Sequence, residues 1–253
     1  MTITLRATSI GPLLTLLLWV LPLPVQAEPA RDVGAYAQGI ALDRRALRQA
    51  MGPPPAAGSE AASNDLAILL WLQNARTPEM EANTWLTLDR NPMLFSRAVG
   101  VDLQQATPTL TAGLRAFLAP INAEMGRFKR DFARPRPFVQ YPQIQPCLPR
   151  EDSASYPSGH STWYRATAEL LADLIPERRE RLLSVGYHGG ASRATCGAHF
   201  PSDVEAGQRL GAVAARQVIA TPQWQAFRKD PVLQAELEQL RRVPADRLML
   251  LTR

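Results

Sequence analysis

The sequence predicts an all-α fold in a single domain. From residue 64 onward, apolar residues recur at the three- and four-residue spacing of an amphipathic helix, as at Leu66, Leu69 and Leu70. No segment of the sequence alternates apolar and polar residues with the two-residue period of a half-buried strand, and β-branched residues are sparse. Prolines and glycines fall mainly between the periodic segments, where they begin or end helices.

Residues 1–27 have the features of an export signal. A single basic residue, Arg6, precedes an apolar run at Leu13–Leu21, and Val25–Ala27 forms a small-residue cleavage site. A membrane anchor is the alternative, but the run is much shorter than the roughly 20 apolar residues that cross a bilayer. We therefore expect cleavage near Ala27, a periplasmic or secreted product and no stable membrane anchor.

The rest of the chain is expected to have one domain. Residues 28–63 are interpreted as an N-terminal extension, residues 64–243 as the all-α domain and residues 244–253 as a C-terminal tail. The formal net charge of the chain is +5. The basic residues are scattered along the sequence and do not form the arm or stripe typical of nucleic-acid-binding proteins. The sequence therefore predicts no nucleic-acid binding, and a weak positive field that attracts anionic substrates.

The helices of the domain are predicted from apolar periodicity and from signals at their ends. One or two helices are expected over residues 110–133, stopping at Arg134 because Pro135 follows. Residues 138–156 contain three prolines and should form an irregular loop. Further helices are expected over residues 161–175, 177–191, 201–220 and 231–243, the second closed by Gly189-Gly190 and the third begun by Pro201.

Lys129 and Arg136 form the first of three segments with unusual chemistry. Lys129 lies near the end of its expected helix, and Arg136-Pro137 follows beyond the break at Pro135. Two cations at one helix end can hold an anion together, although a solvated basic face would have a similar sequence.

The second segment is Pro157-Ser158-Gly159-His160, directly before the helix expected from residue 161. Free amides at a helix start can surround an anion, and a histidine there can pass it a proton. The alternative is an ordinary helix cap, in which a serine hydroxyl satisfies the free amides.

The third segment contains Ser192-Arg193, then His199 and then Asp203. Because Pro201 starts a helix, Asp203 falls in its first turn and His199 lies just before it. An aspartate in that position can accept a hydrogen bond from the imidazole Nδ1, which leaves Nε2 free to attack. An aspartate cap beside a core histidine is the alternative.

The two cysteines, Cys147 and Cys196, are expected to form a disulfide bond, as an isolated pair in an exported protein usually does. They have no histidine partners at ligand spacing, so we expect no metal site. His188, the third histidine of the chain, is expected to be a surface turn residue.

Taken together, the three segments resemble the signature of the type 2 phosphatidic acid phosphatase superfamily: Lys-x6-Arg-Pro, Pro-Ser-Gly-His and Ser-Arg-x5-His-x3-Asp. Residues 154–161, Ala-Ser-Tyr-Pro-Ser-Gly-His-Ser, are similar to the Gly-Ser-Tyr-Pro-Ser-Gly-His-Thr of one branch, the bacterial class A nonspecific acid phosphatases. Cys196-Gly197 and Asp203-Val204 match that branch as well. The resemblance covers roughly residues 125–210, and Ala154 and Ser161 are departures that leave the chemistry intact.

The resemblance implies the helical bundle that these phosphatases share with vanadium haloperoxidases. It also implies an exported acid phosphatase of broad specificity, without a cofactor or metal, that acts on phosphate monoesters. His199 would be the nucleophile that forms a phosphohistidine, Asp203 would orient it, and His160 would protonate the leaving alcohol. The phosphate oxygens would be held by the remaining motif residues: Lys129, Arg136, Ser158, the amide of Gly159, and Arg193.

Three other functions fit parts of this pattern. A vanadium-dependent haloperoxidase binds vanadate at the same kind of anion site, usually on a much longer chain. A lipid or pyrophosphate phosphatase of the superfamily is the second, and a non-catalytic phosphate-binding protein is the third. The branch suggests small phosphomonoesters and inorganic phosphate as ligands, and a homodimer as the oligomeric state.

Overall fold

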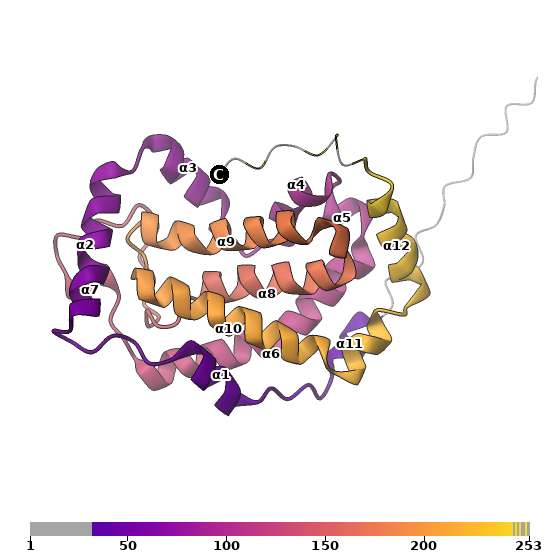
Figure 1. Ribbon diagram of the computed structural model, residues 1–253, viewed down its shortest axis with the longest axis horizontal. Helices are drawn as coiled ribbons and strands as arrows, with labels where there is room; N and C mark the ends of the chain where they lie inside the picture. The colour runs from indigo at the N-terminus through magenta and orange to yellow at the C-terminus, as the bar shows by residue number, and fades with distance from the viewer. Residues whose placement is uncertain (1–31, 245, 247, 249–250, 252–253) are drawn as a thin grey trace, which may run out of the picture.

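The computed structural model describes residues 32–244, 246, 248 and 251, and this part of the chain contains helices and no strands (Figure 1). The all-α prediction is confirmed. The α-helices are α1 (Arg44–Met51), α2 (Glu60–Ala75), α3 (Pro78–Leu86), α4 (Ser96–Val99), α5 (Leu103–Ala106), α6 (Pro108–Phe132), α7 (Pro137–Gln140), α8 (Gly159–Leu174), α9 (Arg179–Thr195), α10 (Pro201–Ile219), α11 (Pro222–Phe227) and α12 (Pro231–Arg241). Short 3-10 helices cover Val33–Ala37, Pro92–Phe95 and Pro176–Arg178.

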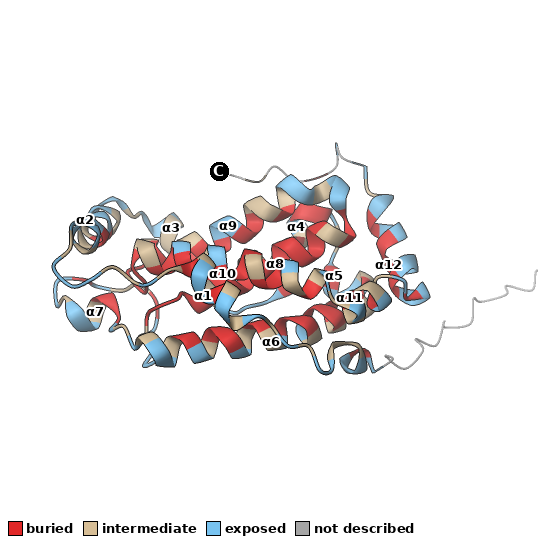
Figure 2. Cartoon of the chain, turned by 60° about the horizontal axis from the view of Figure 1, so that its bottom comes forward, coloured by how far each residue is buried: buried red, intermediate tan, exposed pale blue. Residues whose placement is uncertain are grey.

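Helix α8 forms the centre of the bundle. Helices α9 and α10 pack along it, and α6 packs against it as well (Figure 1). Thirteen of the sixteen residues of α8 are buried, so this helix is covered on nearly every side. Figure 2 shows the buried positions concentrated in these four helices, whereas α2 and α7 project more of their surface to solvent. Burial of the apolar faces of the four helices is therefore the main stabilising contribution to the fold.

Helix α9 corrects one expectation from the sequence. It does not close at Gly189-Gly190 but continues to Thr195. A Cβ atom at Gly189 would lie 2.6 Å from Cδ1 of Tyr164, and one at Gly190 would lie 2.8 Å from Cα of Ser161. The two glycines therefore serve close packing of α9 against α8, which outweighs their poor helix propensity.

The segment before α2 belongs to the same core as the domain. Val33, Leu47 and Met51 are buried in the main apolar cluster, and α1 packs on α10. The boundary expected after residue 63 falls inside α2, which begins at Glu60. The expected export signal lies outside the described residues, as does most of the expected tail at 244–253. None of the described helices is both long and apolar enough to span a bilayer.

The expected disulfide bond between Cys147 and Cys196 is present, with the two Cα atoms 4.8 Å apart. The backbone amide of Cys147 also donates to the carbonyl of Cys196, at 3.1 Å. Residues 141–158, the loop after α7, contain no helix, but the loop expected over residues 138–156 is shorter at its start, because α7 occupies residues 138–140. The bridge therefore ties this loop to the residue that follows α9.

Local sequence signals place four helix ends near this loop. Helix α6 is one continuous helix that ends at Phe132, and Ala133 adopts a left-handed conformation before the prolines begin. Ser158 is the N-cap of α8, and Pro201 occupies the first turn of α10, as expected. Most motif residues therefore lie at the C-terminal ends of α6 and α9 and the N-terminal ends of α8 and α10, and Arg136 is the N-cap residue of α7.

Candidate active site

The structure brings together the residues that the three sequence segments supply. Arg136 lies against His199 and the carbonyl of Ala198, with Nη1 3.0 Å from that oxygen. The amide of Ser158 donates to the carbonyl of Asp203, at 2.9 Å, which joins the start of α8 to the start of α10. A Cβ atom at Gly159 would lie 3.6 Å from Cε of Lys129, so the end of α6 approaches the same place.

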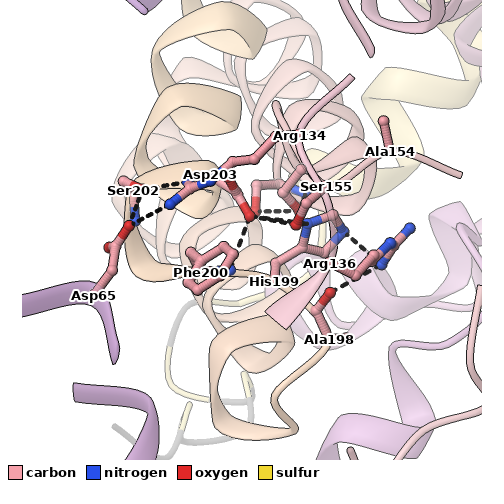
Figure 3. A network of polar contacts seen from close by, with 12 residues as sticks. Asp65, Arg134, Arg136, Ala154, Ser155, Ala198, His199, Phe200, Ser202 and Asp203 are labelled. Carbon is pink, nitrogen blue, oxygen red and sulfur yellow. Dashed lines mark hydrogen bonds and ion pairs between the residues drawn. The ribbon is translucent and has the colours of Figure 1, made fainter. Parts of the chain in front are cut away.

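His199 is buried, with 1% of its surface exposed, and its orientation is fixed by Arg136 (Figure 3). Nη1 of Arg136 lies 3.1 Å from Nε2 of His199. A guanidinium group can only donate, so Nε2 accepts and the ring proton resides on Nδ1. Burial, together with the nearby charges of Arg136 and Lys129, holds the pKa of His199 well below its usual range. The imidazole is therefore neutral, with its Nε2 lone pair turned toward a cation.

Asp203 lies near His199, but the direct hydrogen bond expected from the sequence is not formed. The distance from Nδ1 of His199 to Oδ2 of Asp203 is 3.6 Å, which is beyond hydrogen-bonding range. Ser155 intervenes, because its hydroxyl donates to Oδ2 of Asp203 at 2.5 Å and lies 3.3 Å from Nδ1 of His199. The hydroxyl of Ser155 therefore links Asp203 to His199.

Arg134 holds the other side of the Asp203 carboxylate (Figure 3). Its Nη1 donates to Oδ1 of Asp203 at 2.6 Å, and its Nη2 donates to Asp65 of α2 at 2.9 Å. The guanidinium also stacks on the ring of Phe200, 4.0 Å from the centroid. Burial raises the pKa of Asp203, and Arg134, Ser155 and the amide of Phe200 oppose that rise. These donors favour the carboxylate form.

Arg193 is nearly fully buried, and only part of its guanidinium group is hydrogen-bonded. Its Nη2 donates to the carbonyl and the hydroxyl of Thr87, at 2.5 and 2.6 Å. Its Nε and Nη1 are buried and have no hydrogen-bond partner. Unpaired buried donors on a cation are costly, and an anionic ligand would satisfy them. Burial lowers the pKa of Arg193 to about 10, so it stays charged at neutral pH.

His160, at the first turn of α8, is held by a backbone carbonyl. Its Nε2 lies 2.8 Å from the oxygen of Leu88, which can only accept, so Nε2 carries a proton. Burial, followed by the charge of Arg193, lowers the pKa of His160 to about 3. An anion bound beside this ring would raise that pKa, because it favours the charged imidazolium.

Ser158 and His188 are two further residues considered from the sequence. The hydroxyl of Ser158 caps α8 by accepting from the amide of Ser161, at 3.4 Å, and the side chain is fully buried. His188 is exposed, as expected, but it lies within α9 rather than in a turn, because α9 continues past it.

Glu151 is a site residue that sequence reasoning missed. Its carboxylate forms an ion pair with Nη2 of Arg136 at 2.6 Å, and both residues line a cavity of about 600 Å³ that also contacts Lys129. Burial alone would raise the pKa of Glu151, but the charge of Arg136 and its hydrogen bond outweigh burial and lower that pKa to about 2. Arg136 therefore already stabilises one carboxylate beside the proposed anion site.

The sequence reasoning also assigned no role to four other parts of the site: Arg134, Ser155, Asp65 and the segment at Thr87. Arg134 belongs to the Arg-Pro-Arg-Pro stretch, which could have signalled it, and Ser155 lies inside the motif at residues 154–161. Asp65 and the segment at Thr87 come from distant parts of the chain and have no local signal. They are placed by packing of α2 and α3 beside α9.

Lys129 gives the site a pH dependence that can be measured. Its Nζ donates to the carbonyl of Ala154, and burial, followed by the charge of Arg136, lowers its pKa to about 7. Lys129 is therefore charged below that pH and neutral above it. We expect sulfate, whose charge is constant in this range, to inhibit roughly tenfold more weakly at pH 8.5 than at pH 6, since one charged hydrogen bond is lost.

The Lys129→Met variant is the control for this measurement. It should bind sulfate weakly at both pH values, with little change between them. Sulfate inhibition of the unaltered protein that is the same at pH 6 and pH 8.5 would contradict the assignment of Lys129 as the titrating cation.

A buried, neutral histidine that faces buried cations, at the ends of packed helices, suits an enzyme that processes phosphate-like oxyanions. A model of the PAP2 superfamily matches residues 109–227 of the chain. An acid phosphatase of Zymomonas mobilis is 31% identical over 208 residues, covering 76% of this chain and 75% of that protein. The chain belongs to the PAP2 superfamily and is an acid phosphatase of that superfamily.

One further relative and one solved structure are similar to the chain. A non-specific acid phosphatase of Providencia stuartii is 30% identical over 196 residues, covering 73% of this chain and 77% of that protein. Among solved structures, a bacterial vanadium-dependent iodoperoxidase matches with a TM-score of 0.51 and 17% identity, over 66% of this chain and 51% of the peroxidase. The structural similarity concerns the fold alone.

Proposed function

We propose that this acid phosphatase hydrolyses small phosphate monoesters, with little selectivity for the alcohol, through a phosphohistidine at His199 and without a metal ion. The orientation of His199 carries the proposal: a buried, neutral imidazole directs its Nε2 lone pair toward Arg136. The unpaired donors of Arg193 support an oxyanion as the ligand. The donor set is cationic, so the charge that magnesium supplies in other phosphoryl transfers comes from side chains.

In the first step, Nε2 of His199 attacks the phosphorus atom and the bond from phosphorus to the alcohol oxygen breaks. The electron pair goes to that oxygen, which takes a proton from His160. His160 is held at Nε2 by Leu88, so Nδ1 is the nitrogen left to meet the leaving group. Negative charge on the three equatorial oxygens is stabilised by the groups that surround the anion: Lys129, Arg136, Arg193, Ser158 and the amide of Gly159.

In the second step, water attacks the phosphohistidine and gives its proton to His160. The bond between phosphorus and Nε2 then breaks, which restores the neutral imidazole of His199. His160 is the acid of the first step and the base of the second, so it alternates between two protonation states. The phosphoryl dianion is present in both steps and raises the low pKa that His160 has in the empty site, which favours proton transfer in either direction.

Two further parts of the proposal rest on separate observations. Low selectivity is supported by the contacts, since the residues assigned here bind the phosphoryl group rather than the alcohol. Export to the periplasm or the medium is supported by the sequence of residues 1–27 and by the Cys147–Cys196 bridge, since such bonds persist in oxidising compartments.

The test is a panel of substrates assayed in acidic buffer with and without EDTA. We expect phosphate release from p-nitrophenyl phosphate, glycerol 2-phosphate and a nucleoside monophosphate at comparable kcat/KM, unchanged by EDTA. Bis(p-nitrophenyl) phosphate, a diester, should be a poor substrate because its second aryl group occupies an oxygen that the cations bind. Activity that disappears with EDTA, or a preference for the diester, would contradict the proposal.

A further inference from the structure

Ser155 occupies the position between the two residues that the proposed mechanism pairs (Figure 3). Its side chain is fully buried, and its hydroxyl is 2.5 Å from Oδ2 of Asp203 and 3.3 Å from Nδ1 of His199. Its backbone amide donates to the carbonyl of Arg134, at 2.8 Å. Ser155 is thus held in place by its backbone, and its hydroxyl contacts both groups.

The chemistry of the three groups fixes the direction of each hydrogen bond. Arg136 donates to Nε2 of His199, so Nδ1 carries the ring proton and must donate. A carboxylate can only accept, so the hydroxyl of Ser155 gives its proton to Asp203. The lone pairs of Ser155 Oγ then face the Nδ1 proton. The bonds run in one direction, from Nδ1–H of His199 to Oγ of Ser155 and from Oγ–H to Asp203.

Asp203 is not free to replace Ser155 in this chain. Its Oδ2 also accepts from the amide of Phe200 at 2.8 Å, and its Oδ1 accepts from Arg134 at 2.6 Å. These bonds anchor the carboxylate at the first turn of α10, where it lies 3.6 Å from Nδ1 of His199. Without the hydroxyl, the Nδ1 proton would be buried with no partner at hydrogen-bonding distance.

We propose that Ser155 is a positioning residue that relays the carboxylate of Asp203 to Nδ1 of His199 and, together with Arg136 at Nε2, keeps the Nε2 lone pair aimed at phosphorus. The inference rests on the proposed phosphohistidine mechanism, in which Nε2 must hold a lone pair. Ser155 does not touch the phosphoryl group, so it affects the rate of attack rather than the binding of anions.

The first test is the Ser155→Ala variant, assayed for kcat and for inhibition by sulfate. We expect kcat to fall roughly 10- to 100-fold, the loss typical of one hydrogen bond to a charged group, with sulfate inhibition within about twofold of the unaltered enzyme. Thr167→Ala is a matched control, because Thr167 is also fully buried and its hydroxyl donates to the carbonyl of Trp163 at 2.8 Å. Thr167 lies about two turns after the start of α8, away from His199 and Asp203. The control should keep the normal kcat.

A double-mutant cycle tests whether Ser155 acts through Asp203. Asp203→Asn removes the charge on which the relay depends, so adding Ser155→Ala to it should lower kcat by less than about threefold. Independent roles would make the two losses multiply instead. Multiplying losses, or a Ser155→Ala variant with the kcat of the unaltered enzyme, would overturn the proposal.

Nitrogen NMR of labelled imidazoles supplies a readout that loss of packing alone would not change. The chain has three histidines, so the spectra are simple to assign with single variants. His199 should be protonated at Nδ1 in all three proteins, because Arg136 still donates to Nε2. The resonances of Nδ1 and its proton should shift only in Ser155→Ala, where that proton has lost its acceptor. Unchanged Nδ1–H resonances in Ser155→Ala would also overturn the relay. Either result leaves His199 as nucleophile to be judged separately, from the activity of His199→Ala.

Discussion

The His199→Ala variant is expected to lose at least about 10⁴-fold in kcat toward p-nitrophenyl phosphate, the scale of loss when a catalytic nucleophile is removed. The cations and the amides at the start of α8 remain in this variant, so it should still bind sulfate. A large fall in kcat with nearly unchanged anion binding is the signature of a lost nucleophile rather than of a lost binding group.

His188→Ala is the matched control, because it removes the exposed histidine of α9 from the same chain. It should keep the kcat of the unaltered enzyme. Comparable turnover by His199→Ala would mean that water, or another side chain, attacks phosphorus directly, and the covalent mechanism would be wrong.

The His160→Asn variant should lose activity in proportion to how poor the leaving group is. With glycerol 2-phosphate the departing alkoxide needs a proton, and kcat/KM should fall about 10²- to 10⁴-fold. With p-nitrophenyl phosphate the departing phenolate is stable without one, and the fall in kcat/KM should be roughly tenfold or less. The measurement uses kcat/KM because this quantity reports the step in which the leaving group departs.

Equal losses on the two substrates would contradict the role of His160 as general acid. They would indicate that His160 contributes to anion binding instead. Sulfate inhibition separates these outcomes, since an acid can be removed with little change in anion affinity, whereas a binding group cannot.

The helical fold could be predicted because it depends on local patterns. Apolar spacing identified the main helices, and proline and serine signals placed the starts of α8 and α10. The end of α9 could not be predicted in this way. Gly189 and Gly190 have the composition of a helix stop, but their lack of a Cβ serves contact with α8, and only the tertiary structure distinguishes the two uses.

The site shows the same division between local and long-range information. The motif residues could be named from the sequence because fixed spacings within short segments carry their chemistry. The support around Asp203 could not, because Asp65 comes from a helix 69 residues before Arg134 in the chain. The Thr87–Leu88 segment, which binds Arg193 and His160, is likewise brought in by packing of α3.

The relation between Asp203 and His199 marks the limit of motif reasoning. The spacing in the sequence puts His199 just before α10 and Asp203 in its first turn, and the structure agrees. A separation of 3.6 Å rather than a direct hydrogen bond is a difference of under 1 Å, set by the other donors to Asp203. Sequence spacing does not resolve such a difference. The difference nevertheless decides whether Asp203 or Ser155 accepts the hydrogen bond from Nδ1 of His199.

Trapping the covalent intermediate tests the central proposal most directly. The His160→Asn variant lacks the base for the second step, so p-nitrophenyl phosphate should convert it to the phosphoenzyme with a burst of one p-nitrophenol per chain. After an alkaline quench, mass spectrometry should find one phosphate on the peptide that contains His199, and mild acid should remove it. Continued release of p-nitrophenol with no phosphate on that peptide, or with phosphate on another residue, would contradict a phosphohistidine at His199.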